Sequence, residues 1–375
     1  MRYNTVTLIY IFLLTSTALS SADSPFTVQS EKEAFTVNLV IGNIERPWSL
    51  AFLPEDNGIL VSQRTGNLLL IRNSRSTIVA GTPRTAAVGQ GGLMDVALSP
   101  FFTEDALVYL SFTEETDGIY GTAVARGRLV TESSDTARLV DTEIIYRALP
   151  KSNSDRHFGS RLVFDEDGYL FITLGERGSR DRAQDTSDPY GSVLRLNPDG
   201  SIPNDNPGFK APEIWSYGHR NAQGAARNPV TGDIWVHEHG PKGGDEINII
   251  RKGANYGWPV VSYGINYNGS IISKETTAAG IEDAVVYWVP SIAPSGMAFY
   301  NNAAFPGWQY NLFVGALAGK QLRRMELKGN QVIHQEVMLQ GQLGRIRDVR
   351  TGPDGFLYLL TDAENGALYR MEPMD

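Results

Sequence analysis

The chain has 375 residues, which is long for one ordinary domain, although closed all-β domains often exceed roughly 200 residues. Its composition is globular, with 42% apolar and 20% charged residues, and it is rich in turn formers, with 38 Gly and 19 Pro. The formal net charge of −9 argues against nucleic acid as a partner, because phosphate binding needs a basic face. The absence of Cys excludes disulfides and a lipid attached to an N-terminal Cys.

Residues 1–22 have the pattern of a cleaved signal peptide. Arg2 provides a positive start, residues 6–19 form an apolar stretch, and Ser20-Ser21-Ala22 provides small residues at the cleavage site. A membrane anchor is the alternative, but the apolar stretch is short, is interrupted by Thr and is followed by no basic stop. We therefore expect a mature chain of residues 23–375 that has no membrane span and is periplasmic or secreted.

A short apolar run bounded by Gly or Asp turns recurs along the mature chain, and no long amphipathic helix is evident. The runs begin at Gly58, Ala106, Gly168, Gly232, Asn311 and Gly355. Their irregular spacing is near the repeat length of four-stranded propeller blades. Two β-sandwiches are the alternative, but no Pro/Ser-rich linker divides the chain. We predict an all-β, six-bladed β-propeller of four-stranded antiparallel sheets, in which one end of a central channel collects loops from all blades.

His157 stands in a polar loop, residues 154–161, just before a predicted strand. A neutral imidazole that faces such a channel is a candidate general base. The alternative for an isolated His is a surface or packing role. The Gly, Asp and Arg residues around His157 favour the functional interpretation.

Four basic residues lie in Gly-containing loops before apolar runs: Arg220, Lys320, Arg345 and Arg347. The i, i+2 spacing of Arg345 and Arg347 puts both guanidinium groups on one side of a strand. Arg favours bidentate recognition of carboxylates, and Lys adds a point charge. The set would suit a ligand with several carboxylates, with the amide of Asn221 beside it. Four unrelated surface cations are the alternative.

Residues 217–259 contain two segments with metal-binding character. His237-Glu238-His239 has two His on one strand face but no third ligand, so structural hydrogen bonding is favoured over zinc. Asp245 and Glu246 follow the Gly240-Pro241 loop, where carboxylates and backbone carbonyls could bind calcium. A solvated acidic turn is the alternative.

Several motifs occur in one order along the chain. They are Gly89-Gln90-Gly91-Gly92-Leu93, His157-Phe158-Gly159-Ser160-Arg161, Gly218-His219-Arg220-Asn221, Glu238-His239-Gly240-Pro241, Asp245-Glu246-Ile247-Asn248, Asn255-Tyr256-Gly257-Trp258-Pro259, Ala293-Pro294-Ser295, Gly319-Lys320 and Arg345-Ile346-Arg347-Asp348-Val349. This ordered set resembles the soluble dehydrogenases of sugars that depend on pyrroloquinoline quinone (PQQ), above all the aldose sugar dehydrogenase branch. The resemblance covers nearly the whole mature chain and also implies a six-bladed propeller.

The resemblance implies roles for individual residues. The cofactor carries three carboxylates and an ortho-quinone, and its contacts would come from Gln90, Arg220, Asn221, Lys320, Arg345 and Arg347. His157 would take the proton of the anomeric hydroxyl as a hydride leaves the sugar C1 for the quinone, which gives a lactone. Electrons would pass to an external acceptor, since the sequence contains no haem-attachment motif.

The resemblance also implies calcium. Main-chain carbonyls of Gly240 and Pro241 would hold one Ca²⁺ against the quinone, where it acts as a Lewis acid. A second, structural Ca²⁺ in some members uses the positions of Asp245, Glu246 and Tyr256.

The chain departs from the family pattern just before the candidate base. Some relatives have an acidic residue there, whereas this chain has Arg156, with Asp155 one position earlier. The long insertions of the glucose-oxidising branch are missing, which suggests an open site and broad aldose specificity.

Two other functions remain open. A non-catalytic propeller binding protein would lack the base or the basic cluster, and this chain has both. A calcium-dependent lactonase-type hydrolase would need a cage of side-chain oxygens on the channel axis and no Arg cluster.

Overall fold

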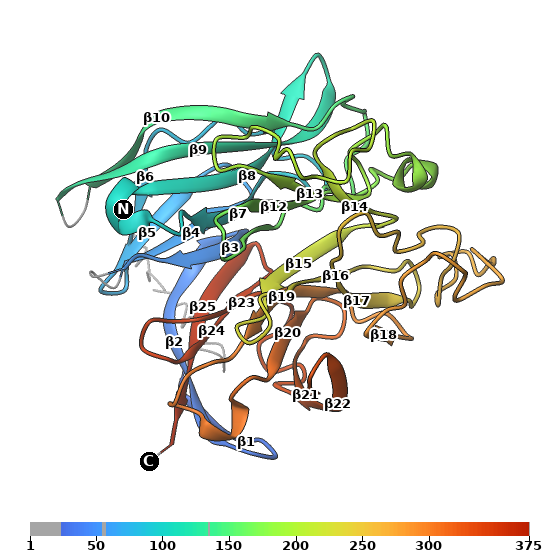
Figure 1. Ribbon diagram of the computed structural model, residues 1–375. Coiled ribbons are helices and arrows are strands. Elements are labelled where there is room, and N and C mark those ends of the chain that lie inside the picture. The colour runs from blue at the N-terminus through green and yellow to red at the C-terminus, as the bar shows by residue number, and fades with distance from the viewer. Residues whose placement is uncertain (1–23, 55–57, 134–135, 375) are drawn as a thin grey trace, which may run out of the picture.

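The structure, a computed structural model, describes residues 24–54, 58–133 and 136–374. These residues form six antiparallel sheets that stand around a common axis (Figure 1). Five sheets have four strands each and one has five, which confirms the predicted six-bladed β-propeller. The expected signal peptide lies outside the described residues. Within the described ranges, no helix is both long and apolar enough to cross a membrane.

The strands follow the chain sheet by sheet. The first sheet contains β3 (Pro47–Phe52), β4 (Ile59–Gln63), β5 (Leu68–Arg72) and β6 (Arg75–Val79). The second contains β7 (Leu93–Leu98), β8 (Leu107–Thr116), β9 (Ile119–Ser133) and β10 (Thr136–Arg147). The third contains β11 (Leu162–Phe164), β12 (Leu170–Thr173), β13 (Ser192–Leu196) and β14 (Ile214–Tyr217).

The fourth sheet contains β15 (Ala222–Arg227), β16 (Ile234–Glu238), β17 (Asp245–Ile249) and β18 (Val286–Trp288). The fifth contains β19 (Pro294–Phe299), β20 (Leu312–Ala316), β21 (Gln321–Lys328) and β22 (Gln331–Met338). The sixth contains β23 (Ile346–Thr351), β24 (Leu357–Thr361), β25 (Asn365–Pro373), β2 (Ala34–Glu45) and β1 (Phe26–Gln29). Helical turns are short: α1 (Phe102–Asp105), η1 (Arg180–Gln184) and η2 (Pro306–Trp308).

The recurring apolar runs of the sequence all form the second strand of a sheet, namely β4, β8, β12, β16, β20 and β24. These strands are buried on both faces because each packs between neighbouring sheets, and this explains why their sequences are continuously apolar. The first strands of neighbouring sheets contact one another around a closed ring, so they line the axis of the propeller.

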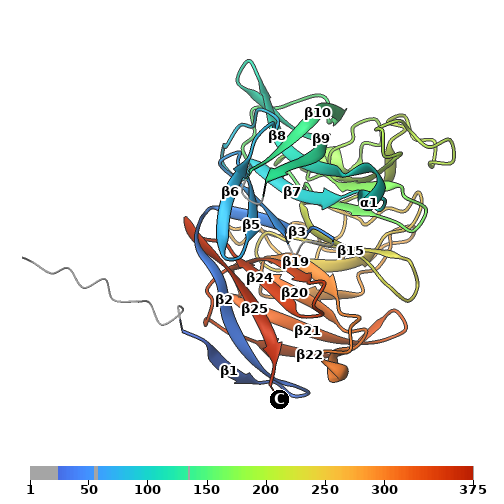
Figure 2. The same cartoon turned by 90° about the vertical axis from the view of Figure 1, so that its left-hand side faces the viewer.

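The sixth sheet joins the two ends of the described chain. Strand β2 pairs with β25, with Asn38 opposite Arg370, and β1 adds a fifth strand outside β2. Figure 2 shows β2 in blue beside β25 in red. The expected count of four strands was therefore one short in this sheet, because residues 26–29 fold back on β2 as a hairpin.

Apolar side chains between adjacent sheets make up the core. The largest cluster lies between the fifth and sixth sheets and includes Phe35, Tyr300 and Trp308, each with 0% exposure. Such side chains contribute about 1.5–3 kcal/mol each when fully buried. The core therefore holds each sheet against the next, and the loops at the ends of the ring remain available for function.

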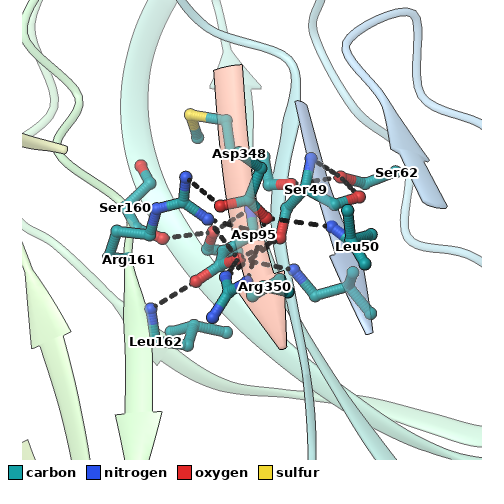
Figure 3. A network of polar contacts seen from close by, with 12 residues as sticks. Ser49, Leu50, Ser62, Asp95, Ser160, Arg161, Leu162, Asp348 and Arg350 are labelled. Carbon is teal, nitrogen blue, oxygen red and sulfur yellow. Dashed lines mark hydrogen bonds and ion pairs between the residues drawn. The ribbon is translucent and has the colours of Figure 1, made fainter. Parts of the chain in front are cut away.

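A buried polar network fills the axis itself (Figure 3). Arg161 of the loop before β11 forms ion pairs with Asp95 of β7 through Nη1 at 3.0 Å and with Asp348 of β23 through Nη2 at 2.9 Å. Arg350 bonds to the same two carboxylates at 3.2 and 3.0 Å, and Ser49 of β3 donates a hydrogen bond to Asp95 at 2.5 Å. Four sheets are thus linked across the centre of the ring.

Candidate functional site

The predicted site residues gather at one end of the ring. Because neighbouring strands are antiparallel, the loops before the first strands and the loops after the second strands open at the same end. Nearly all the predicted residues lie in, or next to, these loops: Gln90 before β7, His157 before β11, Arg220 and Asn221 before β15, Gly240 and Pro241 after β16, Lys320 after β20, Arg345 and Arg347 at the start of β23.

His157 is held in a left-handed backbone conformation, with φ of 53°. Its N–H donates to Gln90 Oε1 at 2.8 Å, and the Gln90 N–H donates to the Asp155 carbonyl at 2.7 Å. This conformation is uncommon for a non-glycine residue and persists only where the surroundings enforce it. Gln90 therefore helps to fix the loop that presents the imidazole.

Glu176, which the sequence analysis missed, orients the imidazole. His157 Nδ1 lies 2.5 Å from Glu176 Oε2, and the same oxygen accepts the Gly178 N–H at 2.8 Å. Burial lowers the pKa of His157, and Glu176 opposes that effect. Burial alone would raise the pKa of Glu176, but its bonds to His157 and Gly178 outweigh burial and lower it. The pair therefore holds an ionised carboxylate against Nδ1 of a neutral imidazole and leaves Nε2 for a substrate.

Gly175, in the loop after β12, allows that loop to pack closely against the loop that carries His157. A Cβ at this position would clash with the His157 carbonyl oxygen and would lie 2.9 Å from Asn221 Oδ1. Asn221 is 1% exposed, and its Oδ1 accepts the Gly159 N–H at 3.2 Å. Asn221 thus packs against the His157 loop and braces it, a contact that the sequence analysis did not predict.

Arg220 is brought to the same place by the fourth sheet. Its Nη1 donates to the His239 carbonyl at 2.8 Å, its N–H donates to Glu238 at 2.5 Å, and its guanidinium lies 5.3 Å from the centre of the Trp258 ring. The charge of Arg220 lowers the pKa of both His157 and Glu176. The base and this cation therefore share one electrostatic environment.

Arg345 and Arg347 lie on one side of the strand, as their spacing predicted. Both bind Asp362, Arg345 at 2.7 Å and Arg347 at 3.1 Å, and Arg347 Nη1 also donates to Gln223 Oε1 at 3.0 Å. Arg347 is 6% exposed, whereas Arg345 is exposed. Their charges lower the pKa of Asp362 to about 2 against the effect of burial, so this half-buried carboxylate is ionised.

The surroundings of His239 indicate that the candidate base and two of the arginines lie near one another. Burial lowers the pKa of His239 to about 3, and the charges of Arg220, Arg347 and His157 contribute to the shift. Its Nε2 lies 2.5 Å from the Pro294 carbonyl oxygen, so its role is structural. Lys320 is exposed in the β20–β21 turn, with φ of 49°, at the same end of the ring.

Asp245 and Glu246 do not share a site. They are consecutive residues of β17, so their side chains point to opposite faces. The Asp245 carboxylate accepts hydrogen bonds from four groups: Gly240 N–H, Ser291 Oγ, Ile292 N–H and Ala293 N–H, at 2.7–2.9 Å. Asp245 thus supports the Gly240-Pro241 loop through these donors, and its role as a metal ligand stays a prediction.

Glu246 lies beside a second buried acid. It is paired across the sheet with Glu238, and burial together with the Glu238 charge raises the pKa of Glu246 to about 8. Glu238 is buried and Glu246 is half-buried, and two neighbouring carboxylates repel each other unless a cation or a proton joins them. The hydroxyl of Tyr256 donates to the Ile249 carbonyl at 2.5 Å, while its ring stacks on His219 at 4.7 Å. In the part of the chain that the structure describes, no three His, Asp or Glu side chains converge on a possible metal position.

Comparisons with known proteins identify the family of the chain. The family model of the glucose/sorbosone dehydrogenases matches residues 44–370. The aldose sugar dehydrogenase YliI of Escherichia coli is 46% identical over 373 residues, which cover 96% of this chain and 98% of that protein. The quinoprotein glucose dehydrogenase B of Acinetobacter calcoaceticus is 29% identical, over 91% of this chain and 89% of its own.

Solved structures of aldose sugar dehydrogenases also superpose on this chain. The apo-form crystal structure of the soluble aldose sugar dehydrogenase of E. coli superposes with a TM-score of 0.86 at 46% identity, over 91% of this chain and all of that chain. The PQQ-bound aldose sugar dehydrogenase of Streptomyces coelicolor superposes with a TM-score of 0.75 at 28% identity, over 93% and 98% of the two chains. From its fold, its site and these comparisons, the chain belongs to the glucose/sorbosone dehydrogenase family.

Proposed function

We propose that the protein, as one catalytic domain of residues 23–375, oxidises aldoses at C1 to lactones with PQQ and Ca²⁺. The observation that carries this proposal is the His157–Glu176 pair beside the buried cations Arg220 and Arg347 at one end of the ring. A base next to a cationic pocket fits a reaction that takes a proton from a neutral sugar beside an anionic cofactor. The names of the relatives support the same reaction class.

The residues present fit a tricarboxylate cofactor. Arg220 and Arg347 are each 6% exposed, and buried guanidinium groups at a channel mouth favour an anionic ligand. We propose cofactor contacts from Gln90, Arg220, Asn221, Lys320, Arg345 and Arg347. Asp362 partly neutralises Arg345 and Arg347, and it also fixes their guanidinium groups in place before the ligand arrives.

Two positions fit calcium for different reasons. Asp245 holds the Gly240-Pro241 loop through the Gly240 N–H, and we propose that the carbonyls of Gly240 and Pro241 bind one ion. The repulsion between Glu238 and Glu246 supports a second ion beside Glu246, to which Tyr256 would contribute. When bound, the quinone supplies a hydride acceptor and the first calcium ion a Lewis acid that polarises it.

His157 performs the proton step in this proposal. Because Nδ1 is held by Glu176, Nε2 faces the substrate and accepts the proton of the anomeric hydroxyl. Burial and the charge of Arg220 keep the imidazole neutral at pH 7, which is the form that a base requires. The sugar loses this proton together with a hydride from C1, so the product is the lactone.

Electrons would then pass to an external acceptor, in an exported protein. The two other functions fit less well. A non-catalytic binding protein has no need of an oriented His157–Glu176 pair, and a lactonase-type hydrolase would need acidic ligands on the axis. The acidic side chains on the axis here, Asp95 and Asp348, are instead paired with Arg161 and Arg350.

Reconstitution tests the function directly. Purified protein free of cofactor should reduce a redox dye with aldoses only after both PQQ and Ca²⁺ are added. Omitting either component, or replacing the aldose with its lactone, gives the controls. Cofactor binding with no turnover of any aldose, or no cofactor binding at all, would refute the proposal, and the second result would favour a non-catalytic propeller.

Glu176→Gln should shift the pH dependence as well as the rate. Because Glu176 raises the pKa of His157, its neutralisation lowers that pKa, and the acid limb of kcat/KM moves to lower pH. We expect a loss in kcat of about 10–100-fold, the range seen when carboxylates that orient a metal-binding His are replaced. Glu143→Gln, which alters an exposed pair with Arg126, is the matched control. An unshifted acid limb would show that Glu176 does not act through His157.

A further inference from the structure

Two arginines at the mouth of the site take no part in the steps above. Arg156 immediately precedes His157, and its side chain is 63% exposed. Arg180 begins η1, shortly after Glu176, and is also exposed. In a chain with a net charge of −9, two exposed cations in the loops that carry His157 and Glu176 stand out against the average surface.

Arg156 is held at the rim by its neighbours. Its carbonyl oxygen accepts a bond from Arg177 Nη1 at 2.8 Å, and a Cβ at Gly178 would lie 3.4 Å from its Cδ. The charge of Arg156 contributes to the lowered pKa of His157, so the two groups are close enough to interact. Its contact with Asp155 is a single 3.7 Å approach between two exposed side chains, which neutralises little.

Arg180 is fixed by neutral groups. Its Nη2 donates to Asn266 Oδ1, and its guanidinium lies 5.3 Å from the centre of the Trp258 ring. The same ring lies 5.3 Å from the guanidinium of Arg220. A cation–aromatic contact and an amide orient the Arg180 charge without cancelling it. Trp258 therefore connects the rim to the cationic pocket.

We propose that Arg156 and Arg180 select aldoses that carry an anionic group, a carboxylate or a phosphate, away from the anomeric carbon. The inference rests on the proposed function, since it places C1 of the sugar at His157. An arginine binds either group through paired N–H donors, and both guanidinium groups here retain N–H donors for such a ligand. The anionic group thus adds binding that a neutral aldose lacks, and the mouth cations attract it against the overall negative charge.

The test compares glucose, glucuronic acid and glucose 6-phosphate with the reconstituted holoenzyme. We expect kcat/KM to be higher for at least one of the two anionic sugars than for glucose, and this advantage to shrink in 0.5 M salt, about where screening shortens to a few ångströms. Whichever anionic sugar is preferred identifies the group as carboxylate or phosphate. Equal values for all three sugars would overturn the inference and leave the proposed function intact, whereas turnover of none would overturn both.

Two variants test whether Arg156 and Arg180 cause the preference for an anionic sugar. Arg156→Gln and Arg180→Gln should each lower the ratio of kcat/KM for the preferred anionic sugar to that for glucose by about fivefold, which corresponds to the upper range for an exposed ion pair. The ratio removes any change in the pKa of His157, because that change affects both sugars alike. Arg128→Gln, at an exposed pair with Asp141, should leave the ratio unchanged. A ratio unaltered in both rim variants, or a weakened affinity for PQQ in their place, would overturn the assignment.

Discussion

Replacing His157 with Ala should reduce the rate of aldose oxidation by about 10²–10⁴-fold, the usual contribution of a general base. His239 and His219 do not replace it, because His239 Nε2 is bound to the Pro294 carbonyl and His219 Nδ1 is bound to Glu238. The measurement is kcat for dye reduction at saturating PQQ and Ca²⁺. His157→Asn is a useful second variant, since Asn tolerates the left-handed backbone conformation that this position requires.

The contrast with a cofactor contact makes this prediction specific. His157→Ala should bind PQQ with the affinity of the parent protein, because the proposed cofactor contacts come from other residues. Arg347→Ala should do the reverse, weakening PQQ binding in a titration that needs no turnover. Full activity in both His157 variants would refute the proton step, and a loss of PQQ affinity in His157→Ala would place the imidazole against the cofactor.

Replacing Arg161 with Met should lower the free energy of unfolding by about 3–5 kcal/mol, the cost of leaving buried charges without their partner. Asp95 and Asp348 are both 0% exposed, and Arg161 binds each of them within 3.0 Å. Arg350 remains, but it is bound to the same two carboxylates and cannot replace the lost bonds to both. The measurement is the midpoint of urea unfolding together with its slope.

An exposed ion pair supplies the control for Arg161→Met. Arg128→Met removes a 3.2 Å contact with Asp141 on the surface and should cost at most about 1 kcal/mol. If Arg161→Met costs no more than this control, the central network contributes nothing to stability.

Acid should also weaken the central network. Burial opposes ionisation of Asp348, but the charges of Arg161 and Arg350 outweigh burial and lower the pKa of Asp348. The contribution of Asp348 to the free energy of unfolding is therefore complete above the usual pKa range of Asp, and it is lost as the pH falls through the lowered pKa.

The fold could be predicted because each sheet repeats one local signal. The second strand of every sheet is buried on both faces, so its sequence is a short apolar run that needs no knowledge of its partners. The fifth strand of the sixth sheet, β1, has no such signal. Strand β1 alternates between half-buried and exposed residues, and it is defined by its hairpin with β2.

The site could be predicted only where residue type alone carries the chemistry. His157 and the arginines are chemically distinctive, and all lie at the predicted end of the ring. Glu176 could not be found in this way, because its partner is 19 residues earlier and the two meet only when the loops of one sheet fold together. A signal did exist: the Gly175-Glu176-Arg177-Gly178 run follows a second strand, as Gly240 does. The separation of Asp245 from Glu246 has a simpler reason: they are neighbours along β17, and neighbours along a strand face opposite ways.

The joining of β2 to β25 has a consequence for how the protein is made. Asn38 and Arg370 must pair across almost the whole chain, and contacts between such distant residues form slowly. Until β25 is in place, β2 and β24 both present unpaired strand edges, which are templates for pairing with other chains. A nascent chain is therefore most prone to aggregation before β25 has been synthesised, and the pairing of β25 between β24 and β2 converts an open arc of sheets into a closed ring.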